Sequence, residues 1–168
     1  MLQAVGHLTG LGHRQIAHID GGDGVIAASR RAGYIEAMRA NGLASNIRVV
    51  PGGQTQLDGQ RAARSLLQGG ELPTALVTYN DDTAVAVINH LVQEGVKVPD
   101  QISVIGWDDQ EAAALSPIPL TTVVQEPAEM ARLALRRVAD RLEQRRVTSR
   151  EIVIEPHLRV RASTAPVA

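Results

Sequence analysis

Short apolar segments alternate with longer segments of helical periodicity along most of the chain. The short segments are apolar on both faces, and several end at turn-forming residues such as those at positions 20–22 and 51–53. Runs of this kind are typical of β-strands that are buried on both sides. The pattern predicts strands at residues 15–19, 47–50, 74–79, 102–105 and 120–124.

The segments between these strands carry apolar residues three and four positions apart, which is the spacing of an amphipathic helix. Helices are predicted over residues 27–40 and 57–68, and a third helix follows a cap at Asn80 and ends before Gly95. Strands that alternate with helices favour a parallel sheet with helices on both faces. The predicted fold class is therefore α/β.

The last part of the chain has a different pattern. Pro127 and Glu129 mark the start of a helix over residues 127–145, and strands are predicted at residues 151–154 and 158–160. One face of this helix is apolar. We interpret its other face as a solvated surface, since a basic helix in a chain of net charge −1 is weak evidence for nucleic acid binding. That face carries Arg132, Arg136, Arg137, Arg141, Arg145 and Arg146.

Composition narrows the class of protein. The 168 residues are 44% hydrophobic and 21% charged, which is ordinary for a globular protein, and the net charge gives no reason to expect nucleic acid or an anionic membrane as partner. The absence of cysteine excludes disulfides, thiolate metal sites and a cysteine nucleophile, and the histidines show no metal-binding spacing. Since we find no signal-peptide pattern and no apolar run of about 20 residues, we expect a cytoplasmic protein.

Polar side chains stand at the carboxyl ends of the predicted strands, where open α/β sheets bind ligands. Carboxylates, carboxamides and a guanidinium, with Trp107 and Tyr79 beside them, suit a polyhydroxylated or heterocyclic ligand. None of these residues forms a nucleophile with an activating base, so we predict neither an enzyme nor a cofactor. The candidate ligand-binding residues are Asp20, Arg30, Gln54, Asn80, Asp108 and Gln125.

Several of these residues could instead have a purely structural role, and the sequence alone does not decide between the two roles. Aspartate and asparagine are common in turns and helix caps, and an indole beside a strand end can belong to the core. The structural alternatives are a turn for Asp20, a cap for Asn80, core packing for Trp107 and a solvated loop for Asp108 and Asp109.

A glycine pattern after the first strand points to a different class of protein. Residues 22–27 fit G-x-G-x-x-A between a strand and a helix, which in a Rossmann fold cradles a pyrophosphate. Such folds also place an acidic residue at the end of the next strand, whereas this chain has Pro51-Gly52-Gly53 there. A nucleotide-dependent enzyme is therefore a remote alternative.

Several longer motifs occur in a fixed order along nearly the whole chain. They are His7-Leu8-x-x-Leu11-Gly12-His13-Arg14, Ser29-Arg30-x-x-Gly33-Tyr34, Pro73-Thr74-Ala75 with Asn80-Asp81, Ile102-Ser103-Val104-Ile105-Gly106-Trp107-Asp108-Asp109, and Pro119-Leu120-Thr121-Thr122-Val123-x-Gln125. In order and spacing they resemble the effector-binding domain of LacI/GalR-type transcription regulators. The resemblance implies a periplasmic-binding-protein-like fold of type I and a sugar, nucleoside or related metabolite bound between two lobes.

The resemblance also assigns expected roles to residues of this chain. It implies that Arg30, Asn80 and Asp108 contact the effector, that Gln54 lines the pocket, and that Gln125 lies near the crossover between lobes. It further implies a homodimer, associated partly through the helix at 84–94. An extracytoplasmic sugar-binding protein of the same fold is the alternative.

The same resemblance divides the chain. Residues 1–126 correspond to the C-terminal lobe, 127–156 to a return segment of the N-terminal lobe, and 157–168 to a final strand and tail. We expect the rest of the N-terminal lobe and the DNA-binding headpiece to be absent from this chain, so that DNA binding would depend on that headpiece. No membrane partner is expected.

Overall fold

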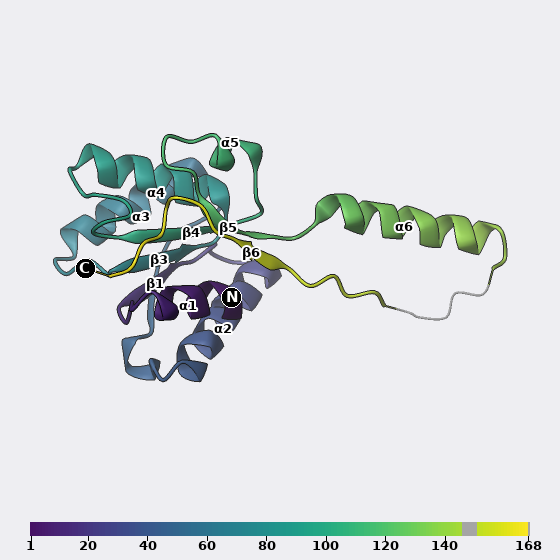
Figure 1. Cartoon of the computed structure of the whole chain (residues 1–168), viewed down its shortest axis with the longest axis horizontal. Helices are drawn as coiled ribbons and strands as arrows, with labels where there is room; N and C mark the ends of the chain where they lie inside the picture. The colour runs from purple at the N-terminus through teal and green to yellow at the C-terminus, as the bar shows by residue number, and fades with distance from the viewer. Residues whose placement is uncertain (146–150, 168) are drawn as a thin grey trace.

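The computed structural model describes residues 1–145 and 151–167 and contains a six-stranded sheet flanked by helices (Figure 1). The strand order is β2-β1-β3-β4-β5-β6, and all neighbouring pairs are parallel except β5 and β6. The predicted parallel α/β fold is confirmed. The strands are β1 (Ile16–Ile19), β2 (Arg48–Val50), β3 (Ala75–Thr78), β4 (Ser103–Trp107), β5 (Thr121–Val124) and β6 (His157–Arg159).

Helices cover the two faces of the sheet and bury a separate apolar cluster on each (Figure 1). Because side chains alternate along a strand, Ile16 of β1 packs into the cluster on one face, whereas Ala17 and Ile19 pack into the cluster on the other. On one face lie α1 (Leu2–Gly10) and α2 (Val25–Ala40), and on the other α3 (Gln56–Gln68), α4 (Asp81–Gln93) and α5 (Glu111–Ala114). A short 3-10 helix, η1 (Ala44–Asn46), precedes β2.

Polar side chains fix the starts of two of these helices. At α3, the Thr55 hydroxyl accepts a bond from the backbone N–H of Asp58, whose carboxylate accepts one from the Thr55 N–H, both at 3.2 Å. This reciprocal capping box satisfies two backbone donors that a helix start leaves open. Asn80 caps α4 by accepting a bond from the Thr83 N–H at 2.9 Å.

A buried carboxylate joins α4 to the sheet. Asp81 accepts hydrogen bonds from the Thr122 hydroxyl at 2.6 Å and from the Gln110 backbone N–H at 2.8 Å, and burial raises the pKa of its carboxyl group. Gly106 of β4 lies next to this carboxylate, and a Cβ at that position would lie 2.2 Å from an oxygen of Asp81. The glycine therefore makes room for the carboxylate between β4 and β5.

Apart from the short helices η1 and α5, which were not predicted, two segments differ from the prediction. Residues 2–10 form α1, which the sequence did not lead us to predict, because Gly6 and Gly10 lower helix propensity; its helical form is stabilised by burial of Val5 and Leu8. The strand predicted at residues 151–154 was wrong. In the part of the chain that the structure describes, no neighbouring strand supplies the hydrogen bonds that such a strand needs.

The remaining boundary differences are small. The final strand lies at His157–Arg159, one residue earlier than predicted, and α6 (Pro127–Leu142) ends three residues before Arg145. Arg146, which was predicted to lie on the arginine face, falls outside the described residues.

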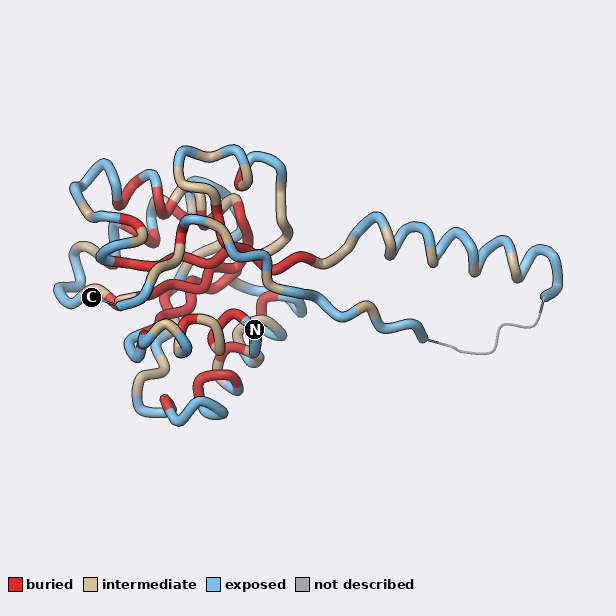
Figure 2. Tube along the Cα trace, viewed as in Figure 1, coloured by how far each residue is buried: buried red, intermediate tan, exposed pale blue. Residues whose placement is uncertain are grey.

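An arm projects from the sheet beyond the ends of β5 and β6 (Figure 1). It consists of residues 127–145 and 151–156, and none of the residues of α6 is buried (Figure 2). Large apolar side chains are open to solvent along it, among them Leu135 at 71% exposure and Leu142 at 80%. The arm therefore lacks a core of its own.

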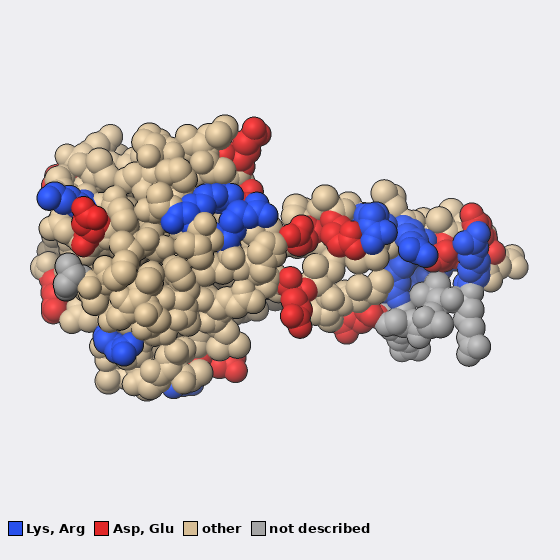
Figure 3. Space-filling view, in the orientation of Figure 1, with Lys and Arg blue, Asp and Glu red and all other residues tan. Residues whose placement is uncertain are grey.

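Charges of both signs alternate along the arm (Figure 3). Arg132 pairs with Glu129 at 2.6 Å, and Arg145 pairs with Glu143 at 2.6 Å. These two arginines are therefore paired with carboxylates, and the interpretation of the whole arginine face as a solvated surface stays a prediction. Among the described residues, no helix has the length and hydropathy required to cross a bilayer.

Candidate functional site

The parallel strands bring the predicted polar residues to one edge of the sheet, as expected from their positions at strand ends. Asp20 follows β1, Asn80 follows β3, Asp108 follows β4 and Gln125 follows β5. Arg30 lies in the second turn of α2, which begins at the same edge. We call Arg30, Tyr79, Trp107, Asp108 and Gln125 the edge cluster.

Asp108 is the centre of the edge cluster. Its Oδ1 atom accepts hydrogen bonds from the Arg30 guanidinium, at 3.3 Å, and from the Gln125 amide. The Asp108 side chain is 30% exposed, so its carboxylate reaches solvent while one oxygen is held. Burial raises the pKa of the Asp108 carboxyl group, and the positive charge of Arg30 opposes that rise. The arrangement suits a carboxylate that accepts hydroxyl hydrogen bonds from a ligand.

Two aromatic rings fix the Arg30 guanidinium. Its carbon atom lies 4.6 Å from the centroid of the Tyr79 ring and 4.7 Å from that of the Trp107 ring. The guanidinium also donates to the backbone carbonyl of Tyr79. Cation–π contacts and a backbone acceptor together hold the cation in one orientation beside Asp108. Trp107 thus has a role at the site edge in addition to packing against the core.

Asn80 and Gln54 lie next to each other at this edge. Besides capping α4, Asn80 donates from Nδ2 to the backbone carbonyl of Gln54 at 2.9 Å. The Gln54 side chain donates to the backbone carbonyl of Gly21 at 3.4 Å. The structural explanation for Asn80 as a helix cap therefore holds, and a second role in ligand binding stays a prediction.

Asp20 has protein partners of its own. Its carboxylate pairs with Arg31, and its Oδ1 atom lies 3.9 Å from Nε2 of the buried His18. Asp20 is only 7% exposed, which leaves little of it open to a ligand in this form of the site. Burial lowers the pKa of His18, so His18 is neutral at neutral pH.

Three interacting residues near the site were missed from the sequence. Arg159 and Arg161 both pair with Asp109, and Arg31 pairs with Asp20. The arginines two positions apart at 159 and 161 were the available signal, because residues two apart in an extended segment point to the same side.

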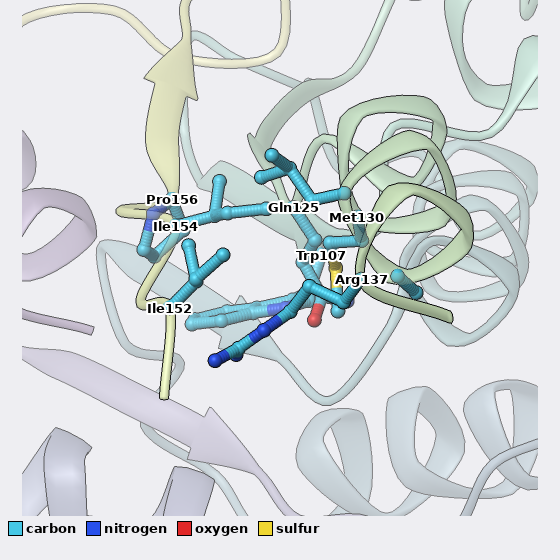
Figure 4. Close-up of a pocket in the computed structure, with 9 residues that line it drawn as sticks. Trp107, Gln125, Met130, Arg137, Ile152, Ile154 and Pro156 are labelled. Carbon is cyan, nitrogen blue, oxygen red and sulfur yellow. The ribbon is translucent and has the colours of Figure 1, made fainter. Parts of the chain in front are cut away.

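A pocket of about 340 Å³ adjoins the edge cluster (Figure 4). Trp107 and Gln125, at the ends of β4 and β5, line it together with apolar side chains of the arm, among them Met130, Ile152 and Ile154. A concave apolar space beside a few convergent polar groups is the usual form of a small-molecule site. Among the described residues, no cluster of three or more His, Asp or Glu side chains is arranged to hold a metal ion.

The sequence matches one family over nearly its whole length. Residues 5–164 fit the model described as a periplasmic binding protein-like domain. The chain is 39% identical over 132 residues to the HTH-type transcriptional regulator AscG of Escherichia coli K12, covering 73% of this chain and 39% of AscG. It is 34% identical over 164 residues to the arabinose metabolism transcriptional repressor of Geobacillus stearothermophilus, covering 94% of this chain and 45% of that protein. The chain spans less than half the length of these two relatives.

Solved structures agree with the sequence match. A LacI transcriptional regulator from a Rhodococcus species superposes with a TM-score of 0.90 at 41% identity, over 99% of this chain and 61% of that chain. A dimeric lac repressor with an 11-residue C-terminal deletion superposes with a TM-score of 0.91 at 27% identity, also over 99% of this chain and 61% of that chain. The relatives named here are transcriptional regulators rather than enzymes. The resemblance drawn from the motifs is confirmed, and the chain belongs to the periplasmic binding protein-like domain family, in the form that LacI-type transcriptional regulators use as their effector-binding domain.

Proposed function

We propose that this chain senses a sugar or sugar-like metabolite for a LacI-type transcriptional regulator and performs no catalysis. The observation that carries the proposal is the edge cluster, in which a fixed guanidinium lies against a partly exposed carboxylate. Neighbouring hydroxyl groups of a sugar can donate to the carboxylate of Asp108 and accept from Arg30. The Trp107 ring, which lines the adjoining pocket, suits the apolar face of a pyranose or a heterocycle.

Names of relatives support a sugar as the ligand class. One relative is a repressor of arabinose metabolism, and a structural neighbour at 32% identity and a TM-score of 0.83 is the regulator CelR in complex with cellobiose. For this chain we propose that Arg30, Asp108 and Gln125 contact the ligand directly. Asn80, Gln54 and Asp20 complete the proposed set along the same edge.

We propose that the arm belongs to a second lobe, which forms the opposite wall of the binding site. The division at residues 1–126, 127–156 and 157–168 follows from this. The exposed apolar side chains of α6 support it, since burial of each such side chain stabilises a fold by roughly 1.5–3 kcal/mol. We further propose that DNA is contacted by a separate headpiece and not by this lobe. We also propose that the regulator acts in the cytoplasm.

A groove beside α4 supports a homodimer. Val85, Ile88 and Val92 of α4 and Pro117 and Ile118 before β5 line an apolar groove of about 250 Å³, and Val92 is 48% exposed. One structural neighbour is described as a dimeric lac repressor. We propose that a second copy of the chain covers this groove, and that Val92→Glu shifts sedimentation toward the monomer.

Titration with named sugars tests the proposed ligand class. L-Arabinose, D-glucose and cellobiose are titrated by calorimetry and followed through the fluorescence of Trp107, the single tryptophan of the chain. We expect weak binding of at least one sugar, because one wall of the site alone buries little of a ligand. Arg30→Met should weaken that binding by about tenfold or more, since the charged donor is lost.

Arg14→Met is the matched control, because Arg14 is exposed and donates to the Thr9 carbonyl at 3.4 Å, before β1 and away from the carboxyl ends of the strands. Its binding should equal that of the unmodified chain. A panel in which no sugar changes either the heat or the Trp107 emission would refute a sugar as ligand class.

A further inference from the structure

Asp109 follows the proposed ligand contact Asp108 directly, yet its side chain is held by protein groups. Arg159 of β6 pairs with one of its carboxylate oxygens, and the Arg161 guanidinium donates to the other at 2.6 Å. Only 12% of the Asp109 side chain is exposed. We call Asp109, Arg159 and Arg161 the clamp.

Arg161 is itself anchored to the sheet. Its guanidinium donates to the backbone carbonyl of Leu120 at 2.8 Å, and its backbone N–H donates to the Thr121 hydroxyl at 2.9 Å. The side chain is 17% exposed. The Asp109–Arg161 pair of the clamp is therefore a largely buried connection between the end of β4 and the start of β5, made by a residue that follows β6.

The backbone at the two aspartates needs such a connection. Asp108 has a φ of 115° and Asp109 a φ of 58°, both in a region that residues with a Cβ rarely adopt. Conformations of this kind persist only where the surroundings hold them, and they gather at functional sites. Because the two residues are consecutive, the backbone conformation at Asp109 is coupled to that of Asp108, whose carboxylate lies in the edge cluster.

The two carboxylates also hold the two strands that lead to and from the arm. Asp108 accepts a bond from Gln125, just after β5, and Asp109 pairs with Arg159 in β6. We propose that Asp109 is a positioning residue: the clamp sets the direction of the Asp108 carboxylate and thereby ties the ligand site to the strand that returns from the arm. Its effect on ligand affinity rests on the proposed function, whereas its effect on the geometry of the edge cluster does not.

A merely structural role for Asp109 predicts a different result. If the clamp only fastened β6, its loss would lower the unfolding temperature and leave the edge cluster unchanged in the folded protein. Trp107 separates these cases, because its ring packs on Arg30, which in turn holds Asp108. Being the single tryptophan, it gives one indole N–H resonance and one emission spectrum.

The experiment compares Asp109→Asn and Arg159→Gln with Arg61→Gln in the full 168-residue chain, well below the unfolding temperature. Arg61 pairs with Asp58 on α3 and serves as the matched control for loss of an ion pair. The readouts without ligand are the Trp107 indole resonance and acrylamide quenching of its emission. We expect both clamp variants to shift the resonance in the same direction and to raise quenching, and Arg61→Gln to leave both unchanged.

Unchanged resonance and quenching in both clamp variants would overturn the proposal. Arg159→Gln keeps the test decisive if Asp109→Asn fails to fold, because the Arg159 side chain is 46% exposed and Arg161 stays in place. Titration with cellobiose and L-arabinose forms a separate arm. If neither sugar binds the unmodified chain, the proposed function fails while the ligand-free readouts still decide the positioning role.

Discussion

The Asn80 side chain donates a hydrogen bond from Nδ2 to the backbone carbonyl of Gln54 while its Oδ1 caps α4. One side chain thus joins the end of β3, the start of α4 and the loop after β2. Both polar atoms of the amide already have one protein partner, so the second N–H on Nδ2 and the second lone pair on Oδ1 are what remain for a ligand. The stability role and the binding role of Asn80 can therefore be separated by substitution.

Asn80→Ala should lower the free energy of unfolding by about 1 kcal/mol, within the range of roughly 0.5–2 kcal/mol for the loss of a helix cap. Asn80→Ser should recover part of this loss, because its hydroxyl still caps the helix, although it has a shorter reach and no amide donor. Urea denaturation measures the stability, and sugar titration measures the binding. If Asn80→Ser leaves both unchanged, Asn80 has no role in the pocket.

Asp108→Asn should weaken sugar binding by about tenfold or more, because each charge-assisted hydrogen bond contributes roughly 1.5–3 kcal/mol. Asparagine tolerates positive φ as aspartate does, so the backbone should be retained. Calorimetry gives the affinity. Asp100→Asn, at an exposed position before β4, is the control, and equal affinities for the two variants would exclude Asp108 as a ligand contact.

The stability of the fold should fall as the pH is lowered from 7.5 to 5.5. Burial lowers the pKa of His7, His13 and His18, so the unfolded chain takes up protons near pH 6.5 that the folded chain binds only at lower pH. The stabilisation is therefore present above about pH 6.5 and is lost as the pH falls toward the lowered values. The raised pKa values of Asp81 and Asp108 act in the opposite sense. Their contribution to stability is fully present below about pH 3.8, the ordinary pKa of these carboxyl groups, and is lost as the pH rises through the raised values.

Urea denaturation at a series of pH values measures this dependence. His18→Gln should flatten it, because glutamine can still donate to the Val77 carbonyl but does not titrate. A slope that His18→Gln does not alter would show that His18 does not contribute.

Gly106→Ala should destabilise the lobe by about 1–3 kcal/mol, because its Cβ would meet the Asp81 carboxylate and the Leu120 side chain at 2.2 and 2.6 Å. Gly6→Ala in α1 is the opposite case. No heavy atom lies within 4 Å of its added Cβ, and alanine should stabilise the helix by roughly 0.5–1 kcal/mol. Thermal unfolding of both variants checks the pair, and equal stability of Gly106→Ala and the unmodified chain would contradict the packing.

The arm should drive self-association of the chain. Leu142 is 80% exposed and Leu133 lines the apolar side of α6 that faces the pocket, so two copies can bury these side chains against each other. Sedimentation over a concentration series should show association, which Leu133→Glu with Leu142→Glu reduces. A species that stays monomeric, with slow hydrogen exchange along α6, would contradict this.

The sheet and its ligand edge were predictable because the relevant signals are local. Strands that are apolar on both faces predict a parallel sheet covered by helices on both sides. Because the carboxyl ends of parallel strands lie at the same edge, the polar residues that follow them are expected there. The partner of each side chain was not predictable. Arg30 and Arg31 are neighbours in sequence, but successive residues of a helix point about 100° apart, so one holds Asp108 and the other holds Asp20.

The same limit applies to the two aspartates after β4. The local pattern does not distinguish Asp108 from Asp109, and only the family resemblance selected Asp108 as a ligand contact. In the structure both residues have positive φ, and Asp108 pairs with Arg30 whereas Asp109 pairs with Arg161. The strand predicted at 151–154 failed for a further reason, because strand formation depends on a neighbour that the local sequence does not specify.

Beta strands β5 and β6 are adjacent and antiparallel, with Val124 opposite His157. Paired strands lie about 4.8 Å apart, so the chain departs for the arm and re-enters the lobe at almost the same point. The intervening excursion is thus an insertion whose two ends a short reverse turn could bridge. Deleting residues 127–155 and joining the strands through Asn-Gly would leave every parallel strand in place. Another domain could be inserted at the same junction without a change in the strand order of this sheet.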